Sequence, residues 1–338
     1  MCEVKMQSFT KAEKHLIKVL GITVAIFFAF FSLCKLISGI AWDRGFFGDH
    51  FWLMLAIVTA LLIAVSAVIV LRVHKGKKSY VFAAVEAVSK YRFLMKQLVK
   101  RDFRTKYLRS FLGVVWSVLN PLMMMLVQYA VFSTIFKSSV PNFAAYLIIG
   151  NVCFTFFTES SSLTMNSIVG NAGLITKVYM PKYIYPLTRT ISSLINLAIS
   201  LVPMLLVCLV TGVRFSSAFF VSPYFFLCLF VFCFGMGMLL SCAMVFFRDT
   251  QFLWGIITTV WTYVTPIFYT IDIIPENLQW FYKLNPMYVY ISGIRSCIMY
   301  GMTPLPGTFL KAAAASLIML VIGAAVFKKG QDRFILYL

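Results

Sequence analysis

Glu159 is a carboxylate within a long apolar segment, and a residue of this kind invites a chemical role. An ionised side chain is costly in an apolar environment, so it faces protein or a water-filled cavity and is a functional candidate by default. The surrounding residues 158–164 are rich in Ser and Thr, whose hydroxyl groups can satisfy the carboxylate oxygens. We expect Glu159 to line a polar passage and to admit or gate the molecule that enters it. The alternative is a structural, hydrogen-bonded acid.

A stripe of aromatic residues is the second candidate. Trp254, Trp261 and Phe268 recur every seven residues, which places them on one face of a helix, and Tyr269 follows directly. Aromatic faces stack against C–H groups, so this stripe could line the passage beside Glu159. Packing is the alternative, because 17% of the chain is aromatic and a buried ring needs no further role.

The sequence lacks the residue patterns of an enzyme. No G-x-x-x-x-G-K-[ST] motif is present to bind the phosphates of ATP. The three histidines, His15, His50 and His74, flank the two N-terminal apolar segments, and no carboxylates are paired across a segment. The eight cysteines include no C-x-x-C pair, which argues against a metal site or a disulfide framework. We therefore expect no enzymatic activity, no cofactor and no metal in this chain.

Composition identifies a lipid bilayer as the solvent of most of this chain. Of 338 residues, 61% are hydrophobic and 12% are charged, whereas soluble domains carry about 25% charged residues. Segments long enough to cross a bilayer occur at 16–41, 51–73, 111–137, 143–167, 185–212, 218–247, 252–272 and 306–327. A further apolar stretch, 284–302, contains Pro286, Gly293 and Arg295, and we expect a broken, re-entrant pair of short helices there. The predicted fold is an all-α integral membrane protein.

The distribution of basic residues orients these spans. If the N-terminus lies inside, the inner segments contain 23 of the 30 Lys and Arg residues and the outer segments contain six. Basic residues concentrate in cytoplasmic loops, so we expect a multi-pass protein with both termini cytoplasmic. The same rule accounts for the net charge of +19 without a nucleic-acid partner. A cleaved signal peptide within 1–41 is the alternative for the first segment, and it leaves the remaining topology unchanged.

Residues 88–107 are expected to form an amphipathic helix that lies in the membrane interface. Their apolar residues follow one stripe at helical spacing, and basic residues occupy the opposite face, among them Lys96, Lys100, Arg101 and Arg104. Such a helix rests its apolar side on the lipid acyl chains and its basic side on acidic head groups of membrane lipids. A linker-like run, KGKKS at 75–79, precedes it. We place a domain boundary near residue 80, between an N-terminal extension, 1–80, with two transmembrane helices and a second domain, 81–338.

A series of motifs after this boundary resembles a known family. The run 98–122, LVKRDFRTKYLRSFLGVVWSVLNPL, resembles the opening of ABC-2 type exporter permeases, in the branch that exports O antigen, teichoic acid and related glycans. The resemblance continues through 156–159 (FFTE), 171–177 (NAGLITK), Pro181 and 186–187 (PL). It resumes at 246–249 (FFRD), 265–269 (TPIFY) and 284–286 (LNP). It covers about residues 90–338, and residues 1–80 have no counterpart in it.

The resemblance implies a six-helix ABC-2 permease core, a homodimer, and a separate cytoplasmic ATPase subunit that binds ATP and Mg²⁺. It also implies a glycan linked to an undecaprenyl-type lipid as cargo, and a place in the cytoplasmic (inner) membrane. Residues 167–185 would then hold the coupling helix that docks on the ATPase, with Asn171, Leu174, Ile175, Lys177 and Pro181 as its main residues. The re-entrant segment would close the passage on the outer side.

Three other classes of protein compete with this reading. An ABC-2 exporter of a drug or small lipid shares the fold, but the basic interfacial helix and the aromatic content favour an anionic, lipid-linked glycan. A membrane transferase that uses polyprenyl lipids would need an acid–base pair or a metal set. A proton-driven flippase would need buried acids in several spans, where Glu159 stands alone. A neighbouring gene for an ATPase, among genes for glycosyltransferases, would decide between them.

Overall fold

The structure is a computed structural model that describes residues 88–107, 113, 115–136, 142–177 and 180–338, with six single positions between 18 and 32. The N-terminal spans predicted at 16–41 and 51–73, and the boundary predicted near residue 80, lie outside these described ranges. Contacts divide the chain into two compact units, Met1–Leu94 and Met95–Leu338. The second unit contains all the sites described below.

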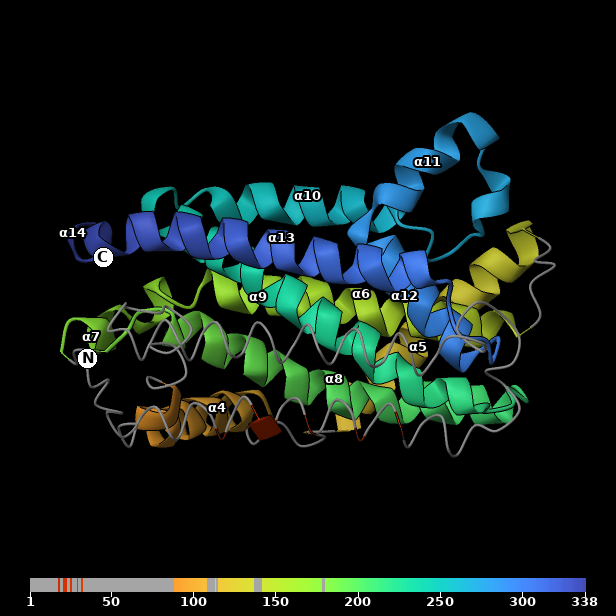
Figure 1. Ribbon diagram of the computed structural model, residues 1–338, viewed down its shortest axis with the longest axis horizontal. Coiled ribbons are helices and arrows are strands. Elements are labelled where there is room, and N and C mark those ends of the chain that lie inside the picture. Colours follow the sequence, from red (N-terminus) through yellow and green to blue (C-terminus); the bar gives the residue numbers. More distant parts are fainter. Residues whose placement is uncertain are drawn as a thin grey trace, which may run out of the picture. The chain divides into compact units, whose positions relative to one another are not determined.

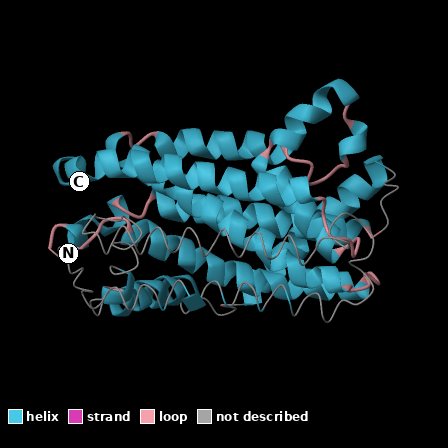
Figure 2. Cartoon of the chain, in the orientation of Figure 1, coloured by secondary structure: helices cyan, strands magenta, loops and turns pink. Residues whose placement is uncertain are grey.

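Every regular element of the described chain is a helix (Figure 2). The long helices are α5 (Val115–Phe136), α6 (Phe143–Met165), α8 (Ile184–Val210), α9 (Ser222–Phe246) and α13 (Pro306–Gly330). Helices of intermediate length are α4 (Arg92–Tyr107), α10 (Thr250–Val264), α11 (Glu276–Leu284) and α12 (Pro286–Ile298). The short turns of helix are η1 (Val169–Asn171), α7 (Ala172–Ile175), η2 (Ser217–Val221), η3 (Ile271–Ile273), η4 (Gln331–Arg333) and α14 (Phe334–Tyr337).

Five helices of the described chain are long and apolar enough to cross a membrane. They are Val115–Ser133, Phe143–Met165, Ile184–Val210, Ser217–Phe246 and Pro306–Tyr337. Each overlaps a span predicted from the sequence, at 111–137, 143–167, 185–212, 218–247 and 306–327. The prediction of an all-helical, multi-pass membrane protein is therefore confirmed for the described residues.

The predicted span at 252–272 is not one helix. Helix α10 ends at Val264 after 15 residues, and Thr265 is extended with φ −90° and ψ 128°. Pro266 follows, and a residue before proline is driven out of the α region by contact with the proline ring. At 1.5 Å per residue α10 is about 22 Å long, short of the hydrocarbon thickness of a bilayer. Hydropathy overestimated this segment because Ile267, Phe268 and Tyr269 continue the apolar run beyond the helix.

Helix α6 is the buried centre of the unit, and α5, α8, α9, α10 and α12 all contact it. Helices α9 and α13 form the closest pair, and Figure 1 shows them side by side. Their backbones touch at Gly235 of α9, where an added Cβ would lie 2.6 Å from the backbone of Leu320. Small residues allow helices in a bilayer to pack at this distance, where dispersion replaces the hydrophobic effect as the driving force.

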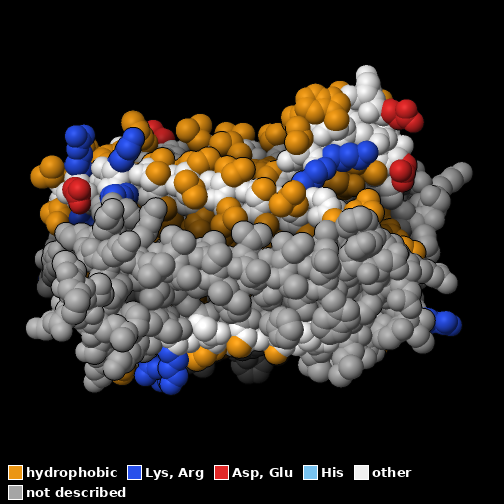
Figure 3. Space-filling view, in the orientation of Figure 1, with side chains coloured by type: hydrophobic (Ala, Val, Ile, Leu, Met, Phe, Trp, Pro, Cys, Tyr) orange, Lys and Arg blue, Asp and Glu red, His pale blue; other side chains and the backbone are white. Residues whose placement is uncertain are grey.

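The surface of the unit is apolar along its length. Exposed large apolar side chains lie on α5, α8, α10 and α13, for example Val127, Val210, Ile256 and Val321. Figure 3 shows hydrophobic side chains along the described edge formed by α10 and α13, with charged side chains near its two ends. A protein in water rarely exposes so large an apolar area, whereas lipid chains cover it without cost.

The broken pair of short helices predicted within 284–302 is not found, because α12 is continuous from Pro286 to Ile298 and α11 already ends at Leu284. Asn285 separates α11 from α12, and its side chain accepts a hydrogen bond from the backbone N–H of Met287 at 3.0 Å. Pro286 occupies the first turn of α12, where its missing N–H costs nothing. These helices lie at the opposite end of the unit from α7 and α14 (Figure 1).

Candidate functional site

The amphipathic helix predicted at 88–107 is present as α4, and it carries the polar contacts of one end of the unit. Lys96, Lys100, Arg101 and Arg104 are exposed, whereas Leu98 and Tyr107 are buried. We call this end, which also holds residues 166–183 between α6 and α8, the basic end.

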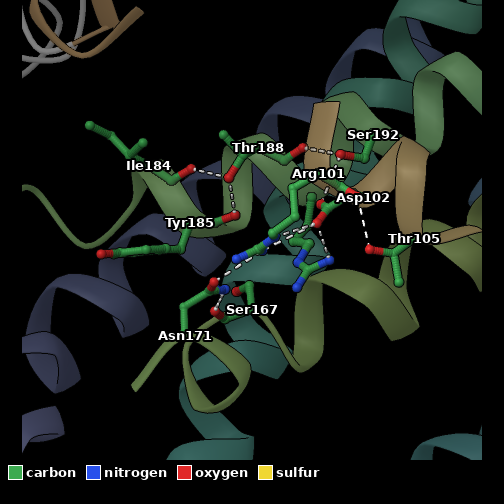
Figure 4. Close-up of polar contacts among 10 residues, drawn as sticks. Arg101, Asp102, Thr105, Ser167, Asn171, Ile184, Tyr185, Thr188 and Ser192 are labelled. Atoms are coloured by element: carbon green, nitrogen blue, oxygen red, sulfur yellow. Dashed lines mark hydrogen bonds and ion pairs between the residues drawn. The ribbon is translucent and has the colours of Figure 1, made fainter. Parts of the chain in front are cut away.

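Asp102 is the acidic residue of α4, and it joins this helix to α8. Its Oδ1 lies 2.9 Å from Nη1 of Arg189, and its Oδ2 accepts a hydrogen bond from Oγ of Ser192 at 3.1 Å. Its side chain is 10% exposed and that of Arg189 is 21% exposed. Figure 4 shows Asp102 of α4 directed toward Ser192 on α8. Charge-assisted bonds with this degree of burial are stronger than surface ion pairs, so Asp102 fixes α4 to a membrane span.

Arg101 connects the same cluster to the segment between α6 and α8. Its Nη2 donates to Oδ1 of Asn171 at 3.1 Å and also lies 3.2 Å from Oδ1 of Asp102. Asn171 is 6% exposed, and its amide nitrogen donates to the backbone oxygen of Ser167 at 2.7 Å. A continuous chain of polar contacts therefore runs from residues 166–171 through α4 to α8 (Figure 4).

Glu159 lies next to this chain, in a second network. Its Oε1 accepts hydrogen bonds from Nζ of Lys106 at 2.5 Å and from Nδ2 of Asn196 at 2.6 Å. Tyr107 donates from its hydroxyl to Oδ1 of Asn196 at 2.7 Å. The expectation that nearby hydroxyls satisfy Glu159 was wrong, because Thr158 and Ser161 donate to backbone oxygens of their own helix and Thr164 bonds to Thr190. A lysine from α4 supplies the positive charge instead.

Two cavities of about 400 and 450 Å³ meet at this network, and both are bordered by Lys106, Glu159 and Asn196. The first also contains Asp102 and Arg189. The second extends to Trp116 and Asn120 of α5. The structure thus places Glu159 beside water-accessible space, as the cost of a buried carboxylate requires.

The five residues predicted to bind an ATPase lie on or near η1 and α7, and they differ in exposure. Asn171 and Ile175 are buried, Leu174 and Pro181 are half-buried, and Lys177 is exposed. Leu174 and Lys177 are therefore accessible to a partner, whereas Asn171 and Ile175 hold the segment against its own chain.

The predicted aromatic stripe is divided between a cluster inside the unit and a loop. Trp254 and Trp261 of α10 pack on Phe157, with ring centroids 6.0 and 5.0 Å away. Their indole N–H groups donate to Ser161 and Asn285 at 3.0 and 2.9 Å. Phe268 is not on this helix face, because α10 ends before it, and it stacks on Phe132 at 5.0 Å. Tyr269 donates from its hydroxyl to the backbone oxygen of Tyr263 at 2.7 Å.

Arg295 is a structural centre that the sequence reasoning missed. The sequence analysis placed it in an outer, re-entrant segment and gave its side chain no role. In the structure this side chain is buried, and the residue is 3% exposed. Its guanidinium donates to the backbone oxygens of Tyr146, Pro266 and Ile267, at 2.8 to 3.2 Å. It also lies 3.4 Å from the ring centroid of Tyr146. Arg295 therefore ties α12 to the start of α6 and to the loop after α10.

The sequence contains signals for Arg295 and for two further residues of these networks, Asp102 and Asn196. Arg295 is a charged residue within an apolar stretch, which is the same signal that singled out Glu159. Asp102 is an acid among basic residues of an amphipathic helix, and Asn196 is an amide within a predicted span. Spacing in the sequence could not predict which residues these side chains contact, because partners such as Asp102 and Ser192 are 90 residues apart.

In the described ranges no group of three His, Cys, Asp or Glu side chains is placed to hold a metal ion. The cluster can therefore position helices and bind polar groups by hydrogen bonds and charge.

Comparisons with known proteins give this arrangement a context. A model of the ABC-2 type transporter family matches residues 94–299. The O-antigen export system permease protein RfbA of Klebsiella pneumoniae is 26% identical over 243 residues, which span 71% of this chain and 93% of that protein. RfbA of Myxococcus xanthus is 26% identical over 252 residues, spanning 74% of this chain and 97% of its own. The polysialic acid transport protein KpsM of Escherichia coli is 24% identical over 247 residues, spanning 70% and 93%.

Proposed function

The chain belongs to the ABC-2 type transporter family, and from this premise we propose that it is the permease of an ATP-driven exporter of a lipid-linked polysaccharide. The observation that carries the proposal is its similarity to permeases named for O-antigen export over 93% to 97% of their length. A second relative is named for polysialic acid transport. We infer that the cargo is an O antigen, a teichoic acid or a similar glycan on an undecaprenyl-type carrier.

We propose that a separate cytoplasmic subunit binds ATP and Mg²⁺ and drives the cycle. Residues 166–183 would be its docking segment, with the half-buried Leu174 as an apolar anchor and the exposed Lys177 beside it. Interface hot spots combine such an anchor with surrounding polar contacts. The basic end would then face the cytoplasm, in agreement with the concentration of Lys and Arg there and with both termini inside.

We propose that two copies form the transport unit. The outer face of α10 supports this, because Phe252, Ile256, Val260 and Tyr263 are exposed on it. Gly255 has open space around its Cα, and Thr259 follows four residues later. Small residues at this spacing let a second helix approach closely in a bilayer. Helices α11 and α12 would then be the outer gate helices that re-enter the membrane.

We further propose that Glu159 lies on the cargo route. Its position between two water-accessible cavities supports this, as do the hydrogen-bonding groups of Asn120 and Asn196 and the exposed ring of Trp116. Amide, carboxylate and indole groups suit the hydroxyls and C–H faces of sugars. Trp254, Trp261, Phe268 and Tyr269 would contribute to the path through the packing that positions α10 and its loop.

The function is tested by reconstitution with the ATPase subunit that we propose as its partner. The full chain alone in vesicles is expected to hydrolyse no ATP, whereas the complex should hydrolyse ATP and move a lipid-linked glycan to the opposite leaflet. Cells from which this gene has been deleted should lose the glycan from their surface and accumulate it inside. Turnover of ATP by this polypeptide alone would contradict the permease assignment, and an unchanged surface glycan would contradict the cargo class.

Leu174→Asp is expected to separate the permease from its ATPase. A carboxylate at an apolar anchor leaves a desolvated charge at the interface, which costs about 2 kcal/mol or more and weakens binding at least tenfold. Co-purification of the two subunits measures this, beside the level of surface glycan. Thr176→Asp, which adds the same charge at an exposed neighbouring position, is the control and should retain more of the complex. If Leu174→Asp leaves both readouts unchanged, residues 166–183 are not the docking segment.

A further inference from the structure

An apolar groove runs between α4 and α8 at the basic end. Its walls are Met95, Val99 and Phe103 of α4 and Ile191 and Ile195 of α8, and it encloses about 520 Å³. Lys96 and Lys100 lie at its rim. We call this feature the α4–α8 groove.

The groove exists because polar contacts join the two helices and leave their apolar faces apart. Asp102 bonds to Arg189 and Ser192, and Tyr107 bonds to Asn196. Few backbone positions of α4 and α8 approach one another closely, unlike those of α6 and α8. The apolar stripe of α4 therefore faces an open space alongside a membrane span.

The charges at the rim are available to an anion. Helix α4 carries six basic residues, and its acid, Asp102, is already paired with Arg189. Lys96 and Lys100 are four residues apart, so they share one face of the helix. Neither of them forms an ion pair within the described part of the chain, and both are exposed.

We propose that the α4–α8 groove is a binding site for one acidic membrane phospholipid. An acyl chain would lie between Val99, Phe103 and Ile195, and the phosphate would lie between Lys96 and Lys100. The walls offer no backbone hydrogen-bonding edge, which an extended peptide would need, whereas an acyl chain needs none. Phosphate and two cations at the interface complement one another in charge. The groove shares Val99, Phe103 and Ile195 with the first cavity beside Glu159, whereas Lys96, Lys100 and Ile191 border the groove and not that cavity.

The test is photolabelling of the full chain in nanodiscs of phosphatidylcholine. Phosphatidylglycerol with a photoreactive group on one acyl chain is added at a low mole fraction, and labelled peptides are identified by mass spectrometry. We expect label on the peptides of α4 and α8 that line the groove. Phosphatidylcholine with the same reactive group should label them several-fold less, because it offers no net negative charge.

Three variants define the site. Lys96→Gln/Lys100→Gln is expected to lower the labelling on the order of tenfold, from the attraction that each basic residue contributes at an acidic surface. Val99→Trp fills the groove without changing the charge, and it should lower the labelling of α8 by a similar factor. Arg92→Gln/Arg104→Gln removes the same charge from α4 outside the lining of the groove and should change it less than twofold. Size-exclusion profiles of all variants report their folding.

Several results would overturn the proposal. Equal labelling by both lipids would show that the lysines do not select the acidic lipid. Unchanged labelling of Val99→Trp would show that the acyl chain does not lie in the groove. A loss in Arg92→Gln/Arg104→Gln as large as in Lys96→Gln/Lys100→Gln would reduce the effect to general surface charge. Displacement of the phospholipid by a smaller amount of polyprenyl phosphate would assign the groove to the cargo lipid. Absence of label on α4 and α8 would assign it to another occupant, such as a segment of residues 1–80.

Discussion

Replacing Arg295 by methionine is expected to lower the free energy of unfolding by about 3 kcal/mol or more. The guanidinium satisfies the backbone oxygens of Tyr146, Pro266 and Ile267 in a buried site. Methionine fills much of the volume but donates no hydrogen bond, and each lost hydrogen bond from a charged group costs about 1.5–3 kcal/mol, although the Pro266 oxygen keeps the hydrogen bond from the Tyr146 hydroxyl. A fall of about 5 °C or more in the unfolding midpoint in detergent would report this loss.

A companion substitution tests whether the effect originates at this contact. A Cβ on Gly150 would lie 2.6 Å from Nη2 of Arg295, so Gly150→Ala should destabilise the normal chain. In Arg295→Met the guanidinium is absent, and the added methyl group should then cost much less. The double variant is expected to be less destabilised than the two single effects combined, as for any pair in direct contact. Arg214→Met, at an exposed position, should stay within about 0.5 kcal/mol of the unmodified protein. Additive effects, or a large effect of Arg214→Met, would contradict this role for Arg295.

Asp102→Ala is expected to reduce glycan export per ATP hydrolysed by about tenfold or more, while the ATPase stays bound. The substitution removes the acceptor that holds Arg189 and Ser192 of α8 and lies beside Arg101. Each hydrogen bond to a charged group contributes about 1.5–3 kcal/mol, so α4 loses its main attachment to α8. We propose that residues 166–171 act on α8 through α4, and Asp102→Ala breaks that path. The measurement is the ratio of exported glycan to released phosphate in reconstituted vesicles.

Three variants separate this loss of coupling from other defects. Asp272→Asn removes an exposed carboxylate at the opposite end of the unit and should leave the ratio unchanged. Glu159→Gln, on the neighbouring network, should keep the subunits together but slow export and hydrolysis alike, because its defect lies on the cargo route. Asp102→Ala with Arg189→Ala should be milder than the two effects combined, since no unpaired arginine remains. If Asp102→Ala exports as much glycan per ATP as the unmodified chain, α4 does not couple ATP hydrolysis to export.

Much of the fold follows from local properties that a sequence displays directly. The spans at 143–167 and 185–212 could be predicted because a helix that crosses a bilayer needs about 20 consecutive apolar residues. The amphipathic helix at 88–107 could be predicted because its stripe repeats at the helical period. Pro286 marks the start of α12, since proline starts a helix well, but the break expected within 284–302 is absent. The resemblance to ABC-2 permeases rested in the same way on residues in sequence order.

The end of α10 shows where local reasoning stops. The apolar run continues from Val264 through Tyr269, so hydropathy extends the span to residue 272. The chain instead turns at Thr265, because Pro266 disfavours a helical conformation before it and the carbonyl groups of Pro266 and Ile267 bond to Arg295. Phe268 thereby leaves the face that it would share with Trp254 and Trp261.

Sequence by itself determined that this chain is a helical membrane protein, which residues form the five long apolar helices, and that Glu159 lies beside polar space, because each depends on the free energy of moving nearby residues into lipid. Tertiary structure decided the partners. Glu159 pairs with Lys106 of α4 and with Asn196 of α8, Asp102 pairs with Arg189, and Arg295 bonds to backbone oxygens of distant segments. The reason is that a buried charge must find a partner of opposite charge or several dipoles, and which groups meet it depends on how helices far apart in sequence pack together.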